Sequence, residues 1–222
     1  FSGVANITGQ SFGGLMASGL LNVVGEHMNG LQMAGIANIT ASKLNGVQIA
    51  LCNYATQARG LQIGLVNYYK EDMKGFQLGL VNANPDTRVQ MMVYGGNATP
   101  ANIGVRFKNQ LFYTILGIGS MYQGLNDKFS ASASYRAGLS FTLYKGLSIS
   151  GDLGYQHIEA FDNKDEVIPK RLYALQARAN LEYQFTRKFG IFATGGYGLT
   201  RFYNKSSNYD KGAIIEAGIV LF

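Results

Sequence analysis

Charged side chains interrupt several long apolar segments of this 222-residue chain, and they are its first candidates for a functional site. Seven of them fall on the expected inner faces of strands: Arg106, Lys108, Arg136, Asp152, Arg178, Glu182 and Glu216. We expect Arg136, Asp152 and Arg178 to lie at similar depth on three consecutive strands, as an Arg–Asp–Arg belt. Around an open pore, such a belt selects solutes by charge. In a filled interior it is a network of ion pairs, because buried charges need partners.

The sequence offers no arrangement typical of catalysis or metal binding. His157 and Glu159 are one histidine and one carboxylate, which are too few ligands for a metal ion. No Ser–His–acid arrangement can be placed on the sequence. The single cysteine, Cys52, cannot form an internal disulfide and supplies no metal set. We therefore expect a protein that is not an enzyme and has no cofactor.

The segment Tyr173–Phe185 indicates the elements that hold these charges. Its odd-numbered positions are all apolar or aromatic, whereas its even-numbered positions include Arg178 and Glu182. In a strand, the two sets lie on opposite faces. An apolar face of this length, with aromatic residues near both ends, matches the depth of a bilayer core crossed at a tilt. The segment is therefore predicted to be a transmembrane β-strand with a polar inner face.

Composition agrees with a membrane protein built from strands. Charged residues make up 14% of the chain, against about 25% in typical soluble domains. No apolar run is long enough for a membrane helix, and only helices and closed barrels satisfy their backbone groups in lipid. The net charge of +6 comes from scattered Lys and Arg residues, so we expect no nucleic-acid partner. Outer-membrane lipid and lipopolysaccharide are the expected partners.

Residues 88–222 are predicted to form eight barrel strands. The expected ranges are Arg88–Gly95, Ala101–Lys108, Leu111–Tyr122, Phe129–Tyr144, Leu147–Glu159, Arg171–Phe185, Phe189–Tyr203 and Gly212–Phe222. Short turns alternate with longer loops between them, as periplasmic turns and external loops do in outer-membrane barrels. The charged loop Glu159–Arg171 is the best candidate for outside contacts. Glu216 and Phe222 are both even-numbered, so they fall on the same face of the last strand, although Phe222 is expected to face lipid and Glu216 the interior. Either this strand carries a bulge or its faces are reversed.

Residues 1–87 contain a repeat with a spacing of 14 to 16 residues. Its units are Gly14–Asn22, Gly30–Asn38, Gly46–Asn53, Gly60–Asn67 and Gly75–Asn82. A fragment of the unit, Ser2–Asn6, precedes them. In a meander, the fragment and the five units add six strands to the barrel, giving about fourteen antiparallel strands with both termini in the periplasm. In the alternative, a β-solenoid stacks Leu61, Ile63 and Leu65 inside and forms Gln and Asn ladders, leaving an eight-stranded C-terminal barrel. The meander is preferred, because every charge in these repeats falls between the Gly-to-Asn units.

The repeat units, the segment N-I-G-V-R-F-K-N-Q-L-F-Y-T-I-L-G that begins at Asn102 and the aromatic last residue resemble a known family. They are similar to the surface-repeat outer-membrane β-barrel proteins of Bacteroides-type bacteria. The resemblance covers essentially the whole chain. It implies a location in the bacterial outer membrane, and it supplies no catalytic or binding residues.

Two functions follow from the predicted barrel. A barrel of about fourteen strands leaves room for a lumen, so the leading expectation is a passive channel for small solutes. About eight strands would instead be filled by side chains. The alternative function is a structural or accessory barrel that binds another envelope protein or lipopolysaccharide through its repeat surface.

Overall fold

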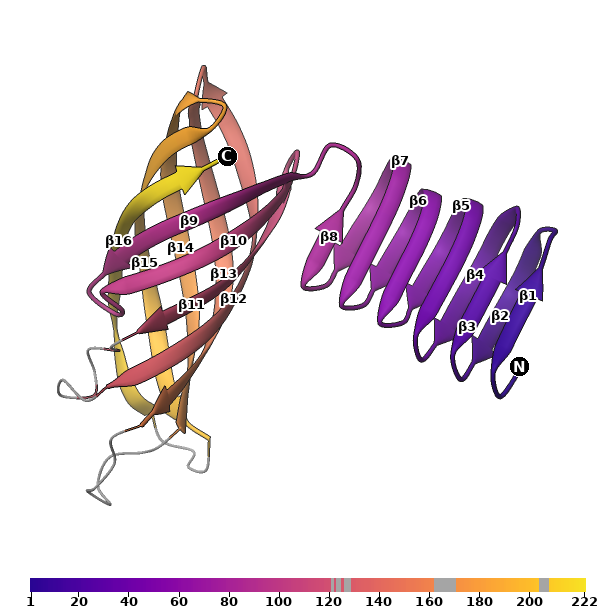
Figure 1. Ribbon diagram of the computed structural model, residues 1–222, viewed down its shortest axis with the longest axis horizontal. Helices are drawn as coiled ribbons and strands as arrows, with labels where there is room; N and C mark the ends of the chain where they lie inside the picture. The colour runs from indigo at the N-terminus through magenta and orange to yellow at the C-terminus, as the bar shows by residue number, and fades with distance from the viewer. Residues whose placement is uncertain (121, 123–124, 126–128, 162–170, 204–207) are drawn as a thin grey trace. The chain divides into compact units, whose positions relative to one another are not determined.

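The computed structural model describes residues 1–120, 122, 125, 129–161, 171–203 and 208–222. The chain divides into two compact units, Phe1–Thr87 and Arg88–Phe222, and both are built from β-strands (Figure 1). Across the described parts of the chain, no helix is long and apolar enough to span a membrane.

The first unit is a β-solenoid, in which parallel strands join successive copies of the repeat. Residues of the same type meet in register, as Gln48 and Gln62 do. An antiparallel meander would reverse that order, so the preferred fourteen-stranded barrel is not confirmed, and the solenoid alternative fits. The strands are β1 (Ala5–Thr8), β2 (Phe12–Ser18), β3 (Leu21–Val24), β4 (His27–Ala34), β5 (Ala37–Ile49), β6 (Cys52–Ile63), β7 (Val66–Leu78) and β8 (Val81–Ala83).

Glutamine side chains form a ladder inside the solenoid. Nε2 of Gln48 donates to Oε1 of Gln32 at 2.8 Å, and Nε2 of Gln62 donates to Oε1 of Gln48 at 2.9 Å. Gln77 continues the ladder to Gln62 at 2.8 Å. Each buried amide thus meets its equivalent from the next coil, which removes the cost of leaving it without a partner. Apolar side chains complete the core: Met16, Val24, Met28, Leu44, Ala55 and Ala58.

An asparagine ladder fixes the corner between the two strand segments of each coil. Nδ2 of Asn38 donates to Oδ1 of Asn53 at 3.1 Å and to the carbonyl of Ile49 at 2.9 Å. Nδ2 of Asn53 does the same with Asn67, at 2.9 Å, and with the carbonyl of Ile63, at 2.7 Å. The Asn that ends each unit therefore bonds to the next coil and to its backbone. The ladder comprises Asn6, Asn22, Asn38, Asn53, Asn67 and Asn82.

The glycine that opens each repeat unit is required by close packing between coils. Gly46 has a φ of 141°, and a Cβ added there would lie 1.9 Å from the carbonyl oxygen of Gly30. Gly60 has a φ of 129° and would place its Cβ 2.0 Å from the oxygen of Gly46. Only glycine tolerates both the conformation and the contact.

The expected inner residues Leu61, Ile63 and Leu65 are the one part of the solenoid prediction that is wrong. Gln62 is fully buried between them, whereas Leu61 and Ile63 are half-exposed and Leu65 is 49% exposed. Strict alternation leaves open which set faces inward. Because identical coils give every inward Gln a partner, the amide face can be buried and the aliphatic face is turned outward.

The second unit is a barrel whose described residues form eight strands closed by antiparallel pairing of β9 with both β10 and β16 (Figure 1). Each range expected from the sequence overlaps one of these strands. They are β9 (Arg88–Gly96), β10 (Ala101–Asn109), β11 (Phe112–Ser120), β12 (Ser130–Tyr144), β13 (Leu147–Ala160), β14 (Arg171–Thr186), β15 (Phe189–Phe202) and β16 (Asn208–Leu221).

The outer wall of the barrel is apolar and its inner wall is polar. On β14, Leu175 and Leu181 are about half exposed, whereas Arg178 and Glu182 are buried. Aromatic rings pack together on the outer wall near both ends of the strands: Tyr155, Tyr173 and Tyr203 at the long-loop end, and Tyr183, Phe185 and Phe189 at the short-turn end. An apolar band between two aromatic girdles is the surface of a membrane-spanning barrel.

Candidate functional site

The barrel interior contains the seven charged residues singled out in the sequence. They lie on β10, β12, β13, β14 and β16, and all are buried except Lys108, which is half-buried. Strand alternation explains why each charge points inward while the residues beside it face outward. The interior is therefore the candidate site.

Arg136 and Asp152 form the most completely bonded pair of the lumen. Nε and Nη2 of Arg136 donate to the two carboxylate oxygens of Asp152 at 2.9 and 2.7 Å. Their side chains are 1% and 0% exposed. Asp152 also accepts hydrogen bonds from the Tyr113 hydroxyl and from Nδ2 of Asn180, each at 2.8 Å. This fork geometry and these added donors are what a buried ion pair needs to offset desolvation.

Arg178 and Glu216 extend this pair into a network with two positive and two negative charges. Asp152 and Arg178 are direct partners across β13 and β14. Nε of Arg178 lies 3.3 Å from Oε2 of Glu216, and Nη1 of Arg136 lies 3.5 Å from the same oxygen. The expected Arg–Asp–Arg belt is thus joined by a second carboxylate, and we call these four residues the central network.

The inward position of Glu216 resolves the parity conflict on the last strand. Glu216 is 4% exposed, and β16 ends at Leu221. Phe222 follows the strand with a φ of 72°, so its side chain does not continue the strand alternation. The pairing of β16 with β15 is unbroken from Asp210, which pairs with Thr200, to Leu221, so no bulge interrupts this part of β16. The residues on either side of Glu216 are therefore the lipid-facing ones.

A second ion-pair group lies nearer the short turns. Nη1 and Nη2 of Arg106 donate to the carboxylate of Glu182 at 2.5 and 2.9 Å, and its Nε and Nη2 donate to Oε1 of Gln90 at 3.0 and 2.7 Å. Nζ of Lys108 donates to the Ser140 hydroxyl at 2.9 Å. Gln90 was not singled out in the sequence, although its alternation with Val89 and Met91 marks it as an inward position.

Both groups bridge opposite walls of the barrel. In the closed ring, β10 and β14 are four places apart, and so are β12 and β16. The Arg106–Glu182 and Arg136–Glu216 contacts therefore cross the lumen. Sequence reasoning placed these residues inside but could not pair them, since partners 76 and 80 residues apart meet only when the ring closes.

Inward glycines make room for Arg178, Asp152 and Tyr113. A Cβ at Gly154 would lie 2.8 Å from Nη1 of Arg178, and one at Gly196 would lie 3.0 Å from its Cγ. A Cβ at Gly138 would lie 2.7 Å from Cβ of Asp152 and 2.8 Å from the Tyr113 ring. None of these three glycines was predicted from the sequence. Small residues at inward positions on or next to the strands that carry Arg136 and Arg178 were the available signal.

The lumen is packed where the two ion-pair groups meet. The cavity between them has a volume of about 10 Å³ and is lined by residues of both groups together with Met92, Ile115 and Phe192. A space of this size is at the lower limit for one water molecule. The same apolar side chains form a core cluster inside the barrel. Side chains of the two ion-pair groups and this apolar cluster are therefore closely packed at this depth.

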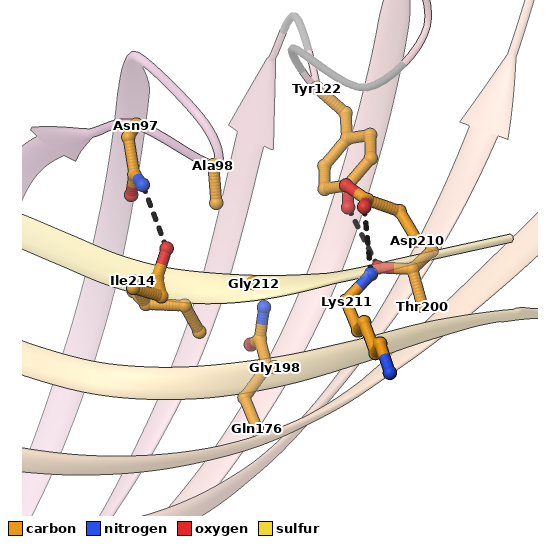
Figure 2. Close-up of a pocket in the computed structure, with 11 residues that line it drawn as sticks. Asn97, Ala98, Tyr122, Gln176, Gly198, Thr200, Asp210, Lys211, Gly212 and Ile214 are labelled. Carbon is orange, nitrogen blue, oxygen red and sulfur yellow. Dashed lines mark hydrogen bonds between the residues drawn. The ribbon is translucent and has the colours of Figure 1, made fainter. Parts of the chain in front are cut away.

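A wider polar cavity lies at the long-loop end of the lumen (Figure 2). It has a volume of about 90 Å³, and its lining includes Gln176, Thr200 and Asp210. Tyr122 reaches into it and shares a 2.7 Å hydrogen bond with the Thr200 hydroxyl. Burial raises the pKa of the Tyr122 hydroxyl above its ordinary value. A cavity this small holds a few water molecules, whereas ligand pockets usually enclose about 300 Å³ or more.

Tyr122 also belongs to an apolar cluster that narrows this end of the barrel. Leu125 and Ile158 are fully buried beside it. The cluster comprises Tyr122, Leu125, Ile158, Ala160, Leu172 and Ala174. The polar cavity and this apolar cluster therefore lie side by side and share Tyr122.

The residues singled out for metal chemistry, His157 and Glu159, lie near the long loops. Within the described ranges, no three His, Cys, Asp or Glu side chains come together to hold a metal ion. His157 bonds to the Tyr203 hydroxyl at 2.8 Å and lies 3.3 Å from Glu159, which pairs with Arg171. These side chains are partly exposed at the long-loop end. Most of the loop expected to make outside contacts, residues 162–170, lies outside the described residues.

Comparisons with known proteins find likenesses only among solved structures. No protein-family model matches the chain, and no curated protein matches it. The N-terminal β-barrel domain of Pseudomonas aeruginosa OprF is 16% identical, with 60% of this chain and 93% of that one covered and a TM-score of 0.38. Neisserial surface protein A is 9% identical, with coverages of 60% and 92% and a TM-score of 0.39. A de novo designed transmembrane β-barrel is 14% identical, with coverages of 60% and 91% and a TM-score of 0.38.

Proposed function

We propose that this chain is a non-enzymatic outer-membrane protein whose barrel is a sealed structural anchor for the repeat unit. One observation carries the proposal: ion pairs join opposite walls of the barrel around a cavity of about 10 Å³. A solute would have to separate buried, bonded charges in order to pass. Breaking such a pair typically costs about 3–5 kcal/mol.

The outer wall supports placement in the outer membrane. Its apolar band and aromatic girdles suit lipid on all sides, and closed barrels of this kind span bacterial outer membranes. Outer-membrane lipid, including lipopolysaccharide, is accordingly the proposed partner of the girdles. Short turns follow β10, β12 and β14, and by the usual rule they face the periplasm. Both ends of the barrel segment, Arg88 and Phe222, would then be periplasmic.

The outer wall also has an apolar groove of about 860 Å³ near the long-loop end. Its lining includes Val93, Ile103, Ile118 and Ile219, which belong to the outward set of their strands. Lipid acyl chains would fill this groove in a membrane, because most of its accessible lining is apolar.

Small-solute passage is the second candidate. The polar cavity of about 90 Å³ and the charged inner wall favour it, since together they form a polar path that is interrupted at the central network. In that case, the network would act as a gate and its arginines would set selectivity for anions.

Single-channel recording in planar bilayers separates the two candidates. The protein is first shown to be folded by its heat-dependent shift in electrophoretic mobility. We expect folded protein to give no defined conductance steps. Regular steps whose anion selectivity falls in Arg178→Gln would reject the sealed anchor and establish the channel.

A further inference from the structure

One corner of the solenoid is a continuous apolar edge. Each coil turns there through an exposed aliphatic residue, and their side chains are between 39% and 51% exposed. The edge consists of Leu20, Ile36, Leu51, Leu65 and Leu80. Exposed apolar rows of this length mark interaction surfaces, because isolated soluble domains seldom leave them uncovered.

Apolar side chains continue from this edge onto both sheets. On one sheet the outward residues include Met33, Phe76 and Leu78, which are 41%, 70% and 52% exposed. On the other sheet, Cys52 and Val66 are paired neighbours and both are exposed. A protein docked on one sheet would cover one of these faces. A bilayer would surround the edge and both faces together.

Polarity rises in order away from the edge. Tyr54 and Tyr68 stack on each other, with ring centroids 5.8 Å apart, three residues beyond the corner leucines. Every charged residue of the repeats lies farther out, at or near the opposite corner: Glu26, Lys43, Arg59, Lys70, Glu71, Asp72 and Lys74. Tyrosine between an apolar and a charged zone is typical of the membrane–water boundary.

The depth of the apolar zone fits one leaflet. At about 3.3 Å per strand residue, Tyr68 lies about 10 Å from the Leu65 corner, and the first charges, Lys70 and Arg59, lie about 17–20 Å from it. Half of a hydrocarbon core is about 15 Å. The tyrosines would therefore reach the boundary from within, and the charges would lie among the headgroups.

The backbone at this edge is also bonded in the way that lipid requires. The amide of Ile36 donates to the carbonyl of Leu20 at 3.0 Å, and that of Cys52 donates to the carbonyl of Ile36 at 2.8 Å. The amides of Leu65 and Val66 both donate to the carbonyl of Leu51. Asparagine side chains bond the adjacent carbonyls from inside. Polar backbone groups that find partners between coils meet the main condition for contact with hydrocarbon.

We infer that the solenoid is itself a membrane-binding element, which inserts its leucine edge into one leaflet of a phospholipid bilayer and holds its charged corner at the headgroups. Its interior is polar and its exterior is apolar, as in the barrel, which is the reverse of a soluble protein. This inference concerns the repeat unit alone and does not depend on whether the barrel is sealed.

Cys52 provides the test, because it is the only cysteine in the chain and lies exposed beside the edge. The full-length protein is labelled there with the fluorophore NBD and refolded into vesicles of phosphatidylethanolamine and phosphatidylglycerol. Insertion of the barrel is confirmed by the heat-dependent mobility shift. We expect a several-fold rise in emission, with quenching by lipids that carry a spin label on the acyl chain. A matched variant, Cys52→Ser with Ser42→Cys, places the dye at the charged corner and should show little acyl-chain quenching.

A second variant tests the edge itself. Leu51→Asp with Leu65→Asp changes only exposed side chains, so the ladders and the barrel are preserved. We expect acyl-chain quenching at Cys52 to fall by at least half, with the mobility shift unchanged. If the dye at Cys52 is unquenched by labelled acyl chains in folded protein, the inference is overturned. A dye that is shielded from water but not quenched also overturns it, and points to a second copy or a protein partner on the edge.

Discussion

The solenoid and the barrel both bury polar side chains and expose apolar ones, but they satisfy the buried groups in different ways. The solenoid uses neutral amides, which meet their equivalents 14 to 16 residues away along the chain. The barrel uses full charges: Arg136 pairs with Asp152 on the next strand, while other partners lie on opposite walls and as far as 80 residues away. A repeat can therefore supply its own partners, whereas the contacts across the barrel, Arg106–Glu182 and Arg136–Glu216, form only once the ring has closed.

This contrast predicts how each unit responds when one partner is removed. An uncompensated buried charge is more costly than an uncompensated buried amide, because a charge loses much more solvation on burial. Removing one partner should therefore destabilise the barrel more than the solenoid. Each variant should destabilise only the unit that contains it.

The largest effect is expected for Asp152→Ala. Arg136 would lose both carboxylate oxygens while 1% exposed, and Tyr113 and Asn180 would lose their shared acceptor. We expect the free energy of unfolding of the barrel to fall by about 3–5 kcal/mol. Urea titration in detergent micelles, followed by circular dichroism and the mobility shift, measures it. Leu153→Ala, which alters the neighbouring outward residue, is the control; an equal loss in both variants would contradict a special role for the network.

A smaller effect is expected for Gln48→Leu in the solenoid. Nε2 of Gln62 would lose its short bond to Gln48 and keep only a long one, 3.5 Å, to the Tyr68 carbonyl, while Oε1 of Gln32 keeps its bond from Thr40. One buried donor left unsatisfied costs about 1–3 kcal/mol. Hydrogen exchange measured by mass spectrometry should show lost protection in peptides of residues 37–63, with the barrel peptides unchanged.

The end of the glutamine ladder offers the matched control. Gln77 donates to Gln62 but no described glutamine donates to it, so Gln77→Leu leaves no buried amide donor without an acceptor in the ladder. Its loss of protection should be the smaller of the two. If both variants lose the same amount of protection, the glutamines stabilise the solenoid through their shape and volume, and the hydrogen bonds along the ladder contribute little.

The same contrast explains what could be predicted from the sequence. Alternation gave the eight barrel strands and the inward position of residues such as Arg178, because period two is visible in one strand alone. The repeat pattern also gave the Gln and Asn ladders of the solenoid alternative. Its inner and outer faces were reversed, since leucine was assigned to the interior by its hydrophobicity. The Arg106–Glu182 pair was beyond prediction, because it depends on a closure that leaves no local signal.

The smallest effect is expected when both members of a buried pair are replaced. Arg106→Met with Glu182→Leu removes two charges at once and fills their space with apolar side chains beside Met92 and Phe192. Such replacements are often neutral or even stabilising, so we expect a change within about 1 kcal/mol of the original stability. Each single variant should instead be destabilised, and a double-mutant cycle gives the coupling. If the double variant is as unstable as the singles, then Gln90 and Lys108 depend on this pair and the group acts as one network. If stability is kept, the pair is not needed to hold the barrel together, and conductance recordings on that variant would show whether it seals the lumen.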